Sequence, residues 1–564
     1  MKLSHFCGAH AAWCVVLIAL VPNMQAQEAT ALRHIGVPQD WSQRQIVFSR
    51  DALAKHPELI EREPRVLYQA MQRWQIPNWG EFHGVEPLAV PAKKTGIHRD
   101  WNVPLLGGSL RKNVFPAKYS YDVAAPPDCV KDYAVFGLGV AGVDGHQANL
   151  VAFNNLYVNG TGTGYCPGLT APTVLFAYNI STATSGPGKV LTSPVLSEDG
   201  TKIAFVESAT GPTPSAIFHV LTWHAGEGAI GTAFTPTAPQ MISLPFSANA
   251  GDIYSSPWVD YATDTAYVGA DNGIVYKITG VFRGTPALSG APWPVTVHIG
   301  YHVTAPVLDS NLGLLMLGNF DGFLYQININ SPTLAVQSYQ IGVTAGDGSG
   351  IASSPIIDIT NGTTFVVTGN VVPGLGSGAA LVEFDTATVT PMSTGPIGIG
   401  GTTGDKLRLL QPAFSNNYYN DPTTGVVTLC GTGATNTSPW QYTFGFSGAI
   451  MNTPRISSSQ LSTVTTDVCS GWTEFFNPNI NSGVDFFFFG LTGDCTLLGH
   501  SSSNTGCVVA LSSDPTIPTA SAFVDAGPSG IIVDNYSIDS QASSIYLGSV
   551  FAQTVYKFTQ NGLN

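Results

Sequence analysis

The chain has 564 residues, of which only 11% are charged, and its 37 Asp and Glu against 23 Lys and Arg give a formal net charge of −14 at pH 7. Residues 27–112 carry twelve basic and nine acidic side chains, whereas residues 113–564 carry ten and twenty-eight, a net of −18. A surface this acidic repels phosphate backbones and anionic lipid, which argues against nucleic-acid binding and against docking on a membrane surface.

The first 26 residues have the pattern of a secretory signal peptide. Lys2 provides a positive start, residues 11–21 form an apolar run, and Ala26 offers a small residue for cleavage. The run is shorter than the roughly 20 apolar residues that a membrane span needs. We therefore expect a secreted or periplasmic protein with no membrane span after signal removal, and an uncleaved anchor is the alternative.

Residues 27–112 form a region of their own, with a helical pattern over residues 51–74. Its apolar residues recur at helical spacing among charged ones: Leu53, Leu59, Ile60, Val66, Leu67 and Met71. Pro57 and Pro64 divide this stretch, so two or three short helices are expected. The region holds too few apolar residues to fold alone. We interpret it as a helical and loop-rich extension packed on the rest of the protein.

A sequence motif that begins with two small residues and a proline recurs along the second part of the chain. Two apolar residues follow the proline, and then comes a second strand, which ends in Gly in three of the four copies. The copies begin at Thr192, Ser255, Thr304 and Ser353, and their prolines, at positions 194, 257, 306 and 355, are 63, 49 and 49 residues apart. A period of roughly 40–50 residues built from short strands indicates a β-propeller.

Paired strand patterns indicate the number of blades. They fall near 149–156 with 173–180, 201–207 with 216–223, 265–270 with 274–278, 313–318 with 323–327, 363–369 with 379–384, 425–431 with 442–446, 484–490 with 507–511, and 544–549 with 553–558. We therefore predict an all-β fold, a single eight-bladed propeller over residues 113–564, with seven blades as the alternative because the last four pairs are less regular. A blade with strands from both chain ends would close the ring without an exposed edge.

Six cysteines remain once the signal is removed, and they allow fifteen pairings. Because each blade contacts itself first, pairing between neighbours in the sequence is favoured. The expected disulfides are Cys129–Cys166, Cys430–Cys469 and Cys495–Cys507. Metal binding is the alternative, but the sequence contains no Cys-x-x-Cys and no His near these cysteines at ligand spacing.

Two stretches of the middle repeats resemble the quinoprotein-alcohol-dehydrogenase-like propeller superfamily. They are Ser255–Ile278 and Ala305–Ile327. The whole chain is also similar to a group of exported bacterial propeller proteins without an assigned activity, on Asp40-Trp41-Ser42 and on residues 151–157. The resemblance implies the propeller fold over residues 113–564. It implies little about function, because one propeller architecture carries many unrelated activities.

The sequence does not support the quinone-dependent activity of that superfamily. Only fragments of the Ala-x-Asp-x-x-Thr-Gly-x-x-x-Trp repeat are present, such as Val382–Thr386. The alcohol-oxidising members carry two adjacent cysteines beside the quinone, and no two cysteines adjoin here. No Asp, Glu and Asn cluster suited to calcium stands out either. We therefore expect no quinone or other cofactor.

Three further motifs have the composition of possible sites. His298 and His302 would lie on one face of a strand, but a zinc site needs at least one more ligand and none is identifiable. Residues 347–350, Asp-Gly-Ser-Gly, resemble part of a calcium loop but lack the later carboxylate, so a solvated turn is favoured. Residues 486–489, four phenylalanines, are best explained as a strand buried on both faces between blades, and an aromatic sugar platform is the alternative.

The sequence thus assigns no catalytic, cofactor-binding or metal-ligating residue. The favoured hypothesis is an exported, non-catalytic propeller scaffold that binds a protein or glycan ligand. The alternative is a propeller enzyme, in its most definite form a quinone-dependent dehydrogenase. Three or more Asp, Glu, His or Arg side chains that converge in one funnel on the propeller axis would favour the enzyme.

Overall fold

The structure, a computed structural model, describes residues 34–74, 96–183, 186–209, 211–343, 350–401, 409–478, 480, 483–499, 505–517, 519–537, 539 and 541–560. The chain divides into two compact units, residues 1–35 and 36–564, and every strand and helix of the described residues belongs to the second. The predicted signal peptide and most of the predicted turn at residues 347–350 lie outside the described residues. The proposed divisions of the chain at residues 26 and 112 stay predictions.

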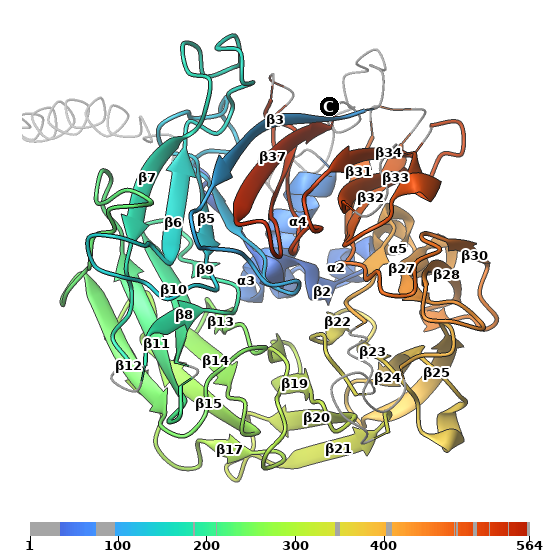
Figure 1. The fold of residues 1–564 in the computed structure, drawn as a ribbon. Helices are drawn as coiled ribbons and strands as arrows, with labels where there is room; N and C mark the ends of the chain where they lie inside the picture. Colours follow the sequence, from blue (N-terminus) through green and yellow to red (C-terminus); the bar gives the residue numbers. More distant parts are fainter. Residues whose placement is uncertain are drawn as a thin grey trace, which may run out of the picture. The chain divides into compact units, whose positions relative to one another are not determined.

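Eight β-sheets follow one another around a central axis, which confirms the predicted eight-bladed propeller (Figure 1). The first four blades are β4 (Ala117–Ser120), β5 (Tyr133–Gly137), β6 (Leu150–Asn154) and β7 (Thr173–Tyr178); β9 (Val195–Leu196), β10 (Lys202–Ala209), β11 (Ser215–Thr222) and β12 (Met241–Ser247), with β8 (Gly188–Val190) also on β10; β13 (Trp258–Asp260), β14 (Thr265–Gly269) and β15 (Ile274–Thr279), with β16 (Ala287–Leu288) and β17 (Val295–Thr296) on β15; and β18 (Val307–Asp309), β19 (Leu314–Gly318), β20 (Phe323–Asn328) and β21 (Val336–Gln340).

The other four blades complete the ring. They are β22 (Ile356–Asp358), β23 (Thr363–Thr368), β24 (Ala380–Asp385) and β25 (Thr390–Pro396); β26 (Ala413–Phe414), β27 (Val426–Thr432) and β28 (Pro439–Ser447), with β29 (Ile450–Met451) and β30 (Ser457–Gln460) on β28; β31 (Thr473–Asn477), β32 (Val484–Leu491), β33 (Cys507–Ser512) and β34 (Ala520–Phe523); and β35 (Ile532–Asp534), β36 (Ser544–Gly548), β37 (Thr554–Gln560) and β3 (Ile97–Pro104). In the second, third and fifth blades, the strand named first, β9, β13 or β22, lies nearest the axis (Figure 1).

All eight predicted strand pairs are present, and seven of them are the second and third strands of a blade. The exception is the first pair, because β6 and β7 are the third and fourth strands of their blade. The second strand of that blade, β5, is not among the predicted strands. It connects to β6 through residues 138–149 and not through a tight turn, so the sequence carries no hairpin signal there.

The ring closes between the two ends of the described chain. β3 pairs antiparallel with the last strand, β37, from Ile97 opposite Gln560 to Pro104 opposite Thr554. Two buried lysines reinforce this junction: Lys118 of the first blade lies 2.8 Å from Asp534 of the last, and Lys557 contacts Asp100 on β3. The pairing of β3 with β37 removes the free edge that the last blade would otherwise expose.

The recurring sequence motif makes a specific hydrogen bond in the structure. In two of its four copies, the hydroxyl of the first residue accepts a hydrogen bond from the backbone N–H of the glycine that ends the second strand, whereas in the copy at Ser353 the N–H of Gly369 donates to the carbonyl oxygen of Gly350. Ser255 Oγ lies 2.6 Å from the nitrogen of Gly269, and Thr304 Oγ1 lies 2.9 Å from that of Gly318. The seventh and eighth blades repeat the contact with Ser470–Gly490 and Ser529–Gly548, at 2.9 and 3.0 Å.

The glycine is required because the next blade packs directly on it. A Cβ atom at Gly269 would lie 2.2 Å from a methyl of Val303, and one at Gly318 would lie 2.3 Å from a methyl of Ile351. Val303 and Ile351 each precede the first strand of the following blade. The motif therefore determines both the position of the inner end of a blade and how that blade contacts the next one.

The structure pairs the six cysteines as predicted: Cys129–Cys166, Cys430–Cys469 and Cys495–Cys507. The first and third bonds close loops within one blade. The second joins β27 of the sixth blade to the segment that precedes β31 of the seventh, so the expectation that each bond stays within its blade holds for two of the three. Among the described residues, no helix is long and apolar enough to cross a membrane.

The four phenylalanines at residues 486–489 lie on β32, which is buried along its whole length as predicted. Phe486 and Phe488 pack in a core shared with β35 and β36 of the eighth blade. Phe487 and Phe489 face the other way, where the ring of Phe489 stacks on that of Trp472 with centroids 4.1 Å apart. A buried strand, not a sugar platform, accounts for them.

The hydroxyl–glycine contact can be tested by the substitution Thr304→Val. Valine keeps the shape of threonine but leaves the buried N–H of Gly318 without its acceptor. We expect the free energy of unfolding to fall by about 1–3 kcal/mol, measured by urea denaturation. The control is Thr296→Val on the exposed end of β17, where a change within about 0.5 kcal/mol is expected. Equal effects at both positions would contradict the assignment.

Candidate functional site: the central channel

The N-terminal segment of the described chain, residues 37–74, closes one end of the central channel, and we call it the plug. β1 (Val37–Gln39) pairs antiparallel with β4, and β2 (Ile46–Val47) pairs in parallel with β22. Between them lies η1 (Trp41–Arg44), and three helices follow, α2 (Arg50–Lys55), α3 (Glu58–Arg62) and α4 (Pro64–Trp74). These confirm the predicted short helices, whereas the two strands are not among the predicted elements.

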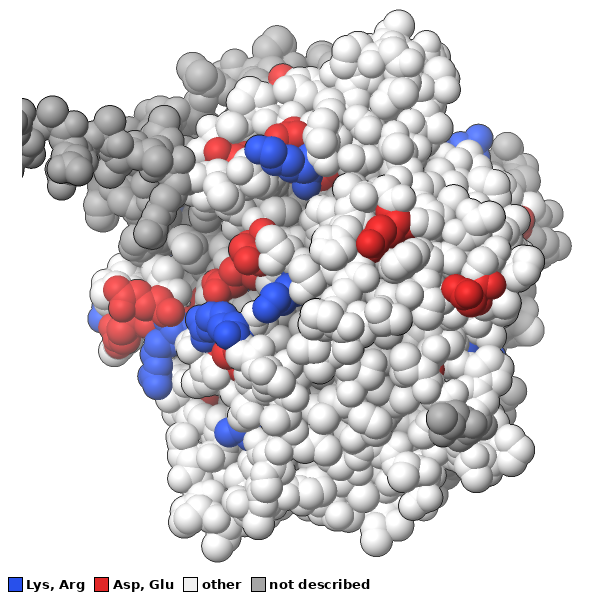
Figure 2. Space-filling view, turned by 90° about the vertical axis from the view of Figure 1, so that its left-hand side faces the viewer, with Lys and Arg blue, Asp and Glu red and all other residues white. Residues whose placement is uncertain are grey.

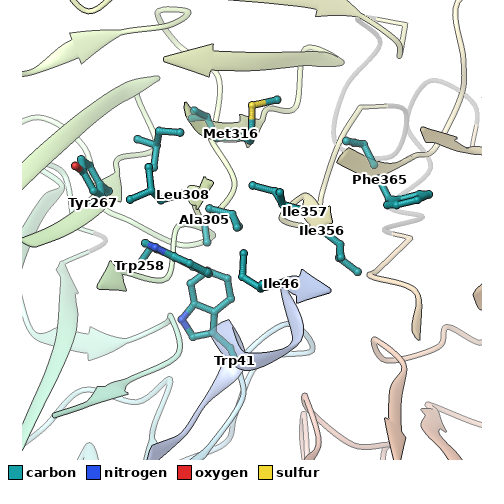
Figure 3. Packing of buried hydrophobic residues seen from close by; sticks show 14 of the residues in the cluster. Trp41, Ile46, Trp258, Tyr267, Ala305, Leu308, Met316, Ile356, Ile357 and Phe365 are labelled. Carbon is teal, nitrogen blue, oxygen red and sulfur yellow. The ribbon is translucent and has the colours of Figure 1, made fainter. Parts of the chain in front are cut away.

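Aromatic and aliphatic side chains of the plug fill the space between the inner strands (Figure 3). The indole Nε1 of Trp41 donates to the carbonyl oxygen of Pro257 at 3.2 Å, and its ring meets the edge of Trp258 with centroids 5.9 Å apart. Ile46 points toward Ile357 and Ala305 in the same cluster. The plug is thus part of the largest hydrophobic core that the described residues form.

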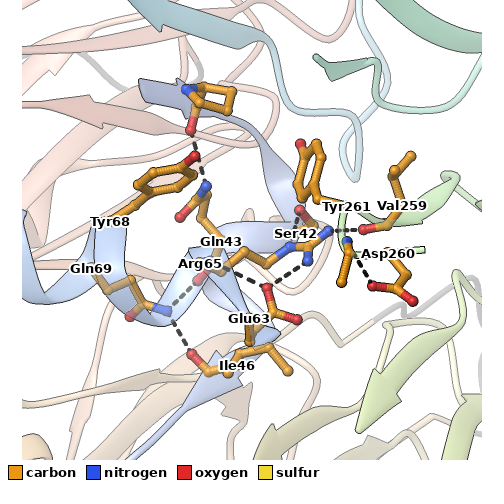
Figure 4. Close-up of polar contacts among 12 residues, drawn as sticks. Ser42, Gln43, Ile46, Glu63, Arg65, Tyr68, Gln69, Val259, Asp260 and Tyr261 are labelled. Atoms are coloured by element: carbon orange, nitrogen blue, oxygen red, sulfur yellow. Dashed lines mark hydrogen bonds and ion pairs between the residues drawn. The ribbon is translucent and has the colours of Figure 1, made fainter. Parts of the chain in front are cut away.

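A fully buried arginine ties the plug to the third blade (Figure 4). Arg65 Nη2 donates to the carbonyl oxygen of Val259 at 2.6 Å, Nη1 to Glu63 at 2.7 Å, and Nε to Ser42 Oγ at 2.8 Å. Its guanidinium lies 3.8 Å from the centre of the Trp258 ring. Burial opposes the charge, but Glu63, Tyr261 and Asp40 together raise the pKa of Arg65 above its ordinary value.

A second set of ionic contacts ties the plug to the sixth and seventh blades. Arg73 pairs with Glu474 on β31 at 2.7 Å, and its guanidinium lies 3.4 Å from the ring centre of Tyr419, on α5 (Asn416–Asn420). Arg44 donates to the carbonyl oxygen of Glu474, and burial lowers its pKa to about 10. Buried, paired cations of this kind hold a segment in one position, and removing one partner leaves the other as an uncompensated buried charge.

One buried carboxyl beside the plug makes stability depend on pH. Asp309 ends β18, and its Oδ1 accepts the backbone N–H groups of Asn311 and Leu312, both at 3.0 Å. Burial raises the pKa of Asp309 to about 6, and the nearby carboxylates of Asp358 and Glu63 add to the rise. The folded state therefore holds this proton more tightly than the unfolded chain does.

We therefore predict that Asp309→Asn stabilises the protein only at higher pH. Because the pKa is raised on folding, the carboxyl's contribution is fully present below about pH 4 and is lost as the pH rises through about 6, at a cost of up to about 3 kcal/mol. Asparagine keeps the turn acceptor without the charge. Urea denaturation at pH 4 and 7.5 should show a gain over the natural protein at pH 7.5 alone. Asp260→Asn, at the corresponding but less buried position of β13, is the control.

The other end of the channel is open and forms a cavity of about 610 Å³. Its lining comes mainly from the segments that precede the inner strands, whereas the plug pairs along the inner strands β4 and β22 and its Arg65 contacts Val259 within β13, so the plug lies farther along the channel than the cavity. We call this cavity the channel mouth. The residues that line it are Ser109, Leu110, Arg111, Lys112, Asn113, Val114, Gly139, Lys189, Leu191, Ile253, Tyr254, Ala352, Leu410, Val550 and Phe551. The volume is in the range of ligand-binding pockets.

Among the described residues that line the channel mouth, the ionic ones are all basic: Arg111, Lys112 and Lys189. This contrasts with the protein as a whole, whose net charge is −14. Charged residues are sparse on the side of the molecule that Figure 2 shows. Arg111 is held in place, since Nη1 donates to the carbonyl oxygen of Ile253 at 3.4 Å and its guanidinium lies 5.2 Å from the ring centre of Tyr254.

A buried carboxyl, Asp252, lies just before the lining residues Ile253 and Tyr254. Burial raises its pKa well above the ordinary value, the carboxylate of Asp271 raises it further, and the positive charge of Arg111 acts in the opposite direction. Its Oδ1 accepts a hydrogen bond from the backbone N–H of Ser255 at 2.8 Å.

The histidine pair that the sequence placed on one strand lies in a loop instead. His298 and His302 belong to the connection between β17 and β18. Each pairs with a different carboxylate, His298 with Asp321 and His302 with Asp271 at 2.8 Å. The strand assignment was wrong although apolar and polar residues alternate from Val295 to Thr304, because the chain turns at Ile299 and Gly300, where Gly300 has a φ of 86°. In the described part of the chain, no group of three or more His, Cys, Asp or Glu could hold a metal ion.

A second constellation, which the sequence did not reveal, has the composition of a catalytic triad. Glu207 Oε2 lies 2.9 Å from His219 Nε2, and Ser243 Oγ lies 3.0 Å from His219 Nδ1. Burial alone would raise the pKa of Glu207, but His219 and the backbone N–H groups of residues 182 and 183 lower it. His219 is stacked on Phe205 with centroids 5.1 Å apart and is fully buried. The three side chains bridge three strands of one blade, and we assign them to blade stability.

The sequence matches no protein-family model, and no curated protein matches it. Among solved structures, the one described as "Structure of Dos1 propeller" is 12% identical, covers 82% of this chain and 95% of that chain, and has a TM-score of 0.48. A chain of "Crystal Structure of Mitotic Checkpoint Complex" is 9% identical, covers 84% and 99%, and has a TM-score of 0.39. Similarity at this level concerns the propeller fold alone.

Proposed function

We propose that this protein is an exported, non-catalytic propeller that binds a ligand at its channel mouth. The observation that carries the proposal is the contrast between the two ends of the channel. The plug fills one end with a core and buried ion pairs, while the other end holds a cavity of about 610 Å³. Concave sites of this size on a rigid scaffold are the usual place for ligands.

The lining of the channel mouth favours binding over catalysis. The enzyme hypothesis calls for at least three Asp, Glu, His or Arg side chains that converge on the axis. Among the described lining residues, only Arg111 is of one of these types. Lysines, apolar side chains and two small polar residues make up most of the rest. Such a set can orient a ligand but offers no acid–base pair of the kind that general catalysis uses.

Export is the second part of the proposal. Three disulfides support it, because such bonds persist in oxidising compartments. We expect signal cleavage after Ala26, so N-terminal sequencing of the protein from the periplasm or medium should begin at Gln27. Ala26→Phe, which places a bulky side chain at the cleavage point, should leave an unprocessed chain. A membrane-retained natural protein with residues 1–26 intact would contradict export.

The binding site can be tested by filling the cavity with the substitution Ser109→Trp. The natural protein and the variant would be applied to a peptide array and a glycan array. We expect at least one ligand that the natural protein binds and the variant loses. An unchanged melting temperature shows that the variant folds. Ligands bound equally by both proteins would place the site elsewhere, and saturable alcohol oxidation after addition of quinone and calcium would favour the enzyme instead.

A further inference from the structure

We propose that the ligand of the channel mouth is an acidic segment of another protein, bound through its carboxylates and its apolar side chains together. This inference rests on the function proposed above. The carboxylates would contact Arg111 and Lys189, and the apolar side chains would pack against the walls and rim of the cavity. Two observations support it, the placement of charge and the composition of the lining.

The placement of charge is selective. Residues 113–564 contain only ten Lys and Arg against twenty-eight Asp and Glu, yet Lys189 from that part lines the cavity beside two further cations from residues 27–112. Among the described residues, Lys189 has no ion-pair partner, and Arg111 is oriented by Ile253 and Tyr254 without a bound carboxylate. The like charges of Arg111 and Lys189 beside one cavity repel each other, and an anionic ligand reduces that repulsion.

The remaining lining residues favour a peptide over a sugar. Leu110, Leu191, Leu410, Val550 and Phe551 are apolar, and of the lining residues only Ser109, Asn113 and Tyr254 carry neutral hydrogen-bonding side chains. A glycan presents many hydroxyls that need such partners when they lose water. Phe551, with 67% of its surface exposed, instead offers an apolar rim for a leucine or phenylalanine of the ligand.

The experiment uses a fluorescein-labelled octapeptide of alternating glutamate and leucine, and fluorescence anisotropy with the exported full-length protein. A second peptide replaces every glutamate by glutamine, and a third replaces every leucine by serine. We expect the first to bind, with an affinity that weakens as salt is raised because screening reduces the attraction. Each replacement should weaken binding by about tenfold or more, since both contributions are required.

Two charge-reversal variants locate the site. Lys189→Glu and Arg111→Glu should each weaken binding of the glutamate peptide by about tenfold or more. Lys55→Glu, which makes the same change on the exposed face of α2 outside the cavity, should leave it unchanged. Equal losses in all three would reveal a general effect of net charge and would overturn the inference.

The outcomes separate the ligand class from the site itself. If glutamate and glutamine peptides bind equally, the ligand is not selected by its charge and the inference fails. If neither binds but a glycan does, and Ser109→Trp abolishes that binding, the channel mouth is a binding site for sugars and only the inference is overturned. If Ser109→Trp blocks no ligand of any class, the proposed function fails with it.

Discussion

The contact between a serine or threonine hydroxyl and the glycine that ends the second strand sets the geometry of this propeller. It holds the start of the inner strand in the third, fourth, seventh and eighth blades, as Ser255 does with Gly269. Because the glycine has no side chain, Val303 of the next blade packs directly on its Cα, and any Cβ there would lie within 2.2 Å of a methyl group. Repeated around the ring, these close contacts determine how the blades meet and how wide a channel they surround.

An eight-bladed ring leaves a channel that its own inner strands do not fill, and the plug fills one end of it. Its strands form hydrogen bonds with the inner strands of the first and fifth blades. Its arginines can enter the core only because they find partners there: Arg65 meets Glu63 and the face of Trp258, and Arg73 meets Glu474 and Tyr419. Unpaired, each buried charge would cost several kcal/mol. The plug and the ring therefore depend on each other.

The repeated strand pairs of the blades could be predicted from the sequence, whereas the features that occur once, the channel mouth and the strands of the plug, could not. Hairpins such as residues 265–279 are indicated by Asp-Asn-Gly turns, and the eight pairs and three disulfides followed from that regularity. The channel mouth did not follow, because Arg111, Lys189 and Phe551 are far apart in the chain and no local pattern links them. Nor did β1 and β2, since strands of two or three residues that complete another sheet carry no alternating pattern of their own. In the sequence Lys189 is only one of a few basic residues, and ring closure is needed to bring it beside the others.

The plug at one end of the channel also determines what the other end can bind. With the plug seated, the channel mouth is the open end of the channel. The net charge of −14 opposes the approach of an acidic ligand to the protein as a whole, so binding of such a ligand at the channel mouth depends on the local field of Arg111 and Lys189. Salt screens the long-range repulsion over about 10 Å and the short contacts much less. If the ligand is acidic, as proposed above, the net negative charge of the protein disfavours its binding elsewhere, and the apolar walls of the channel mouth strengthen its contacts with the cations by excluding water.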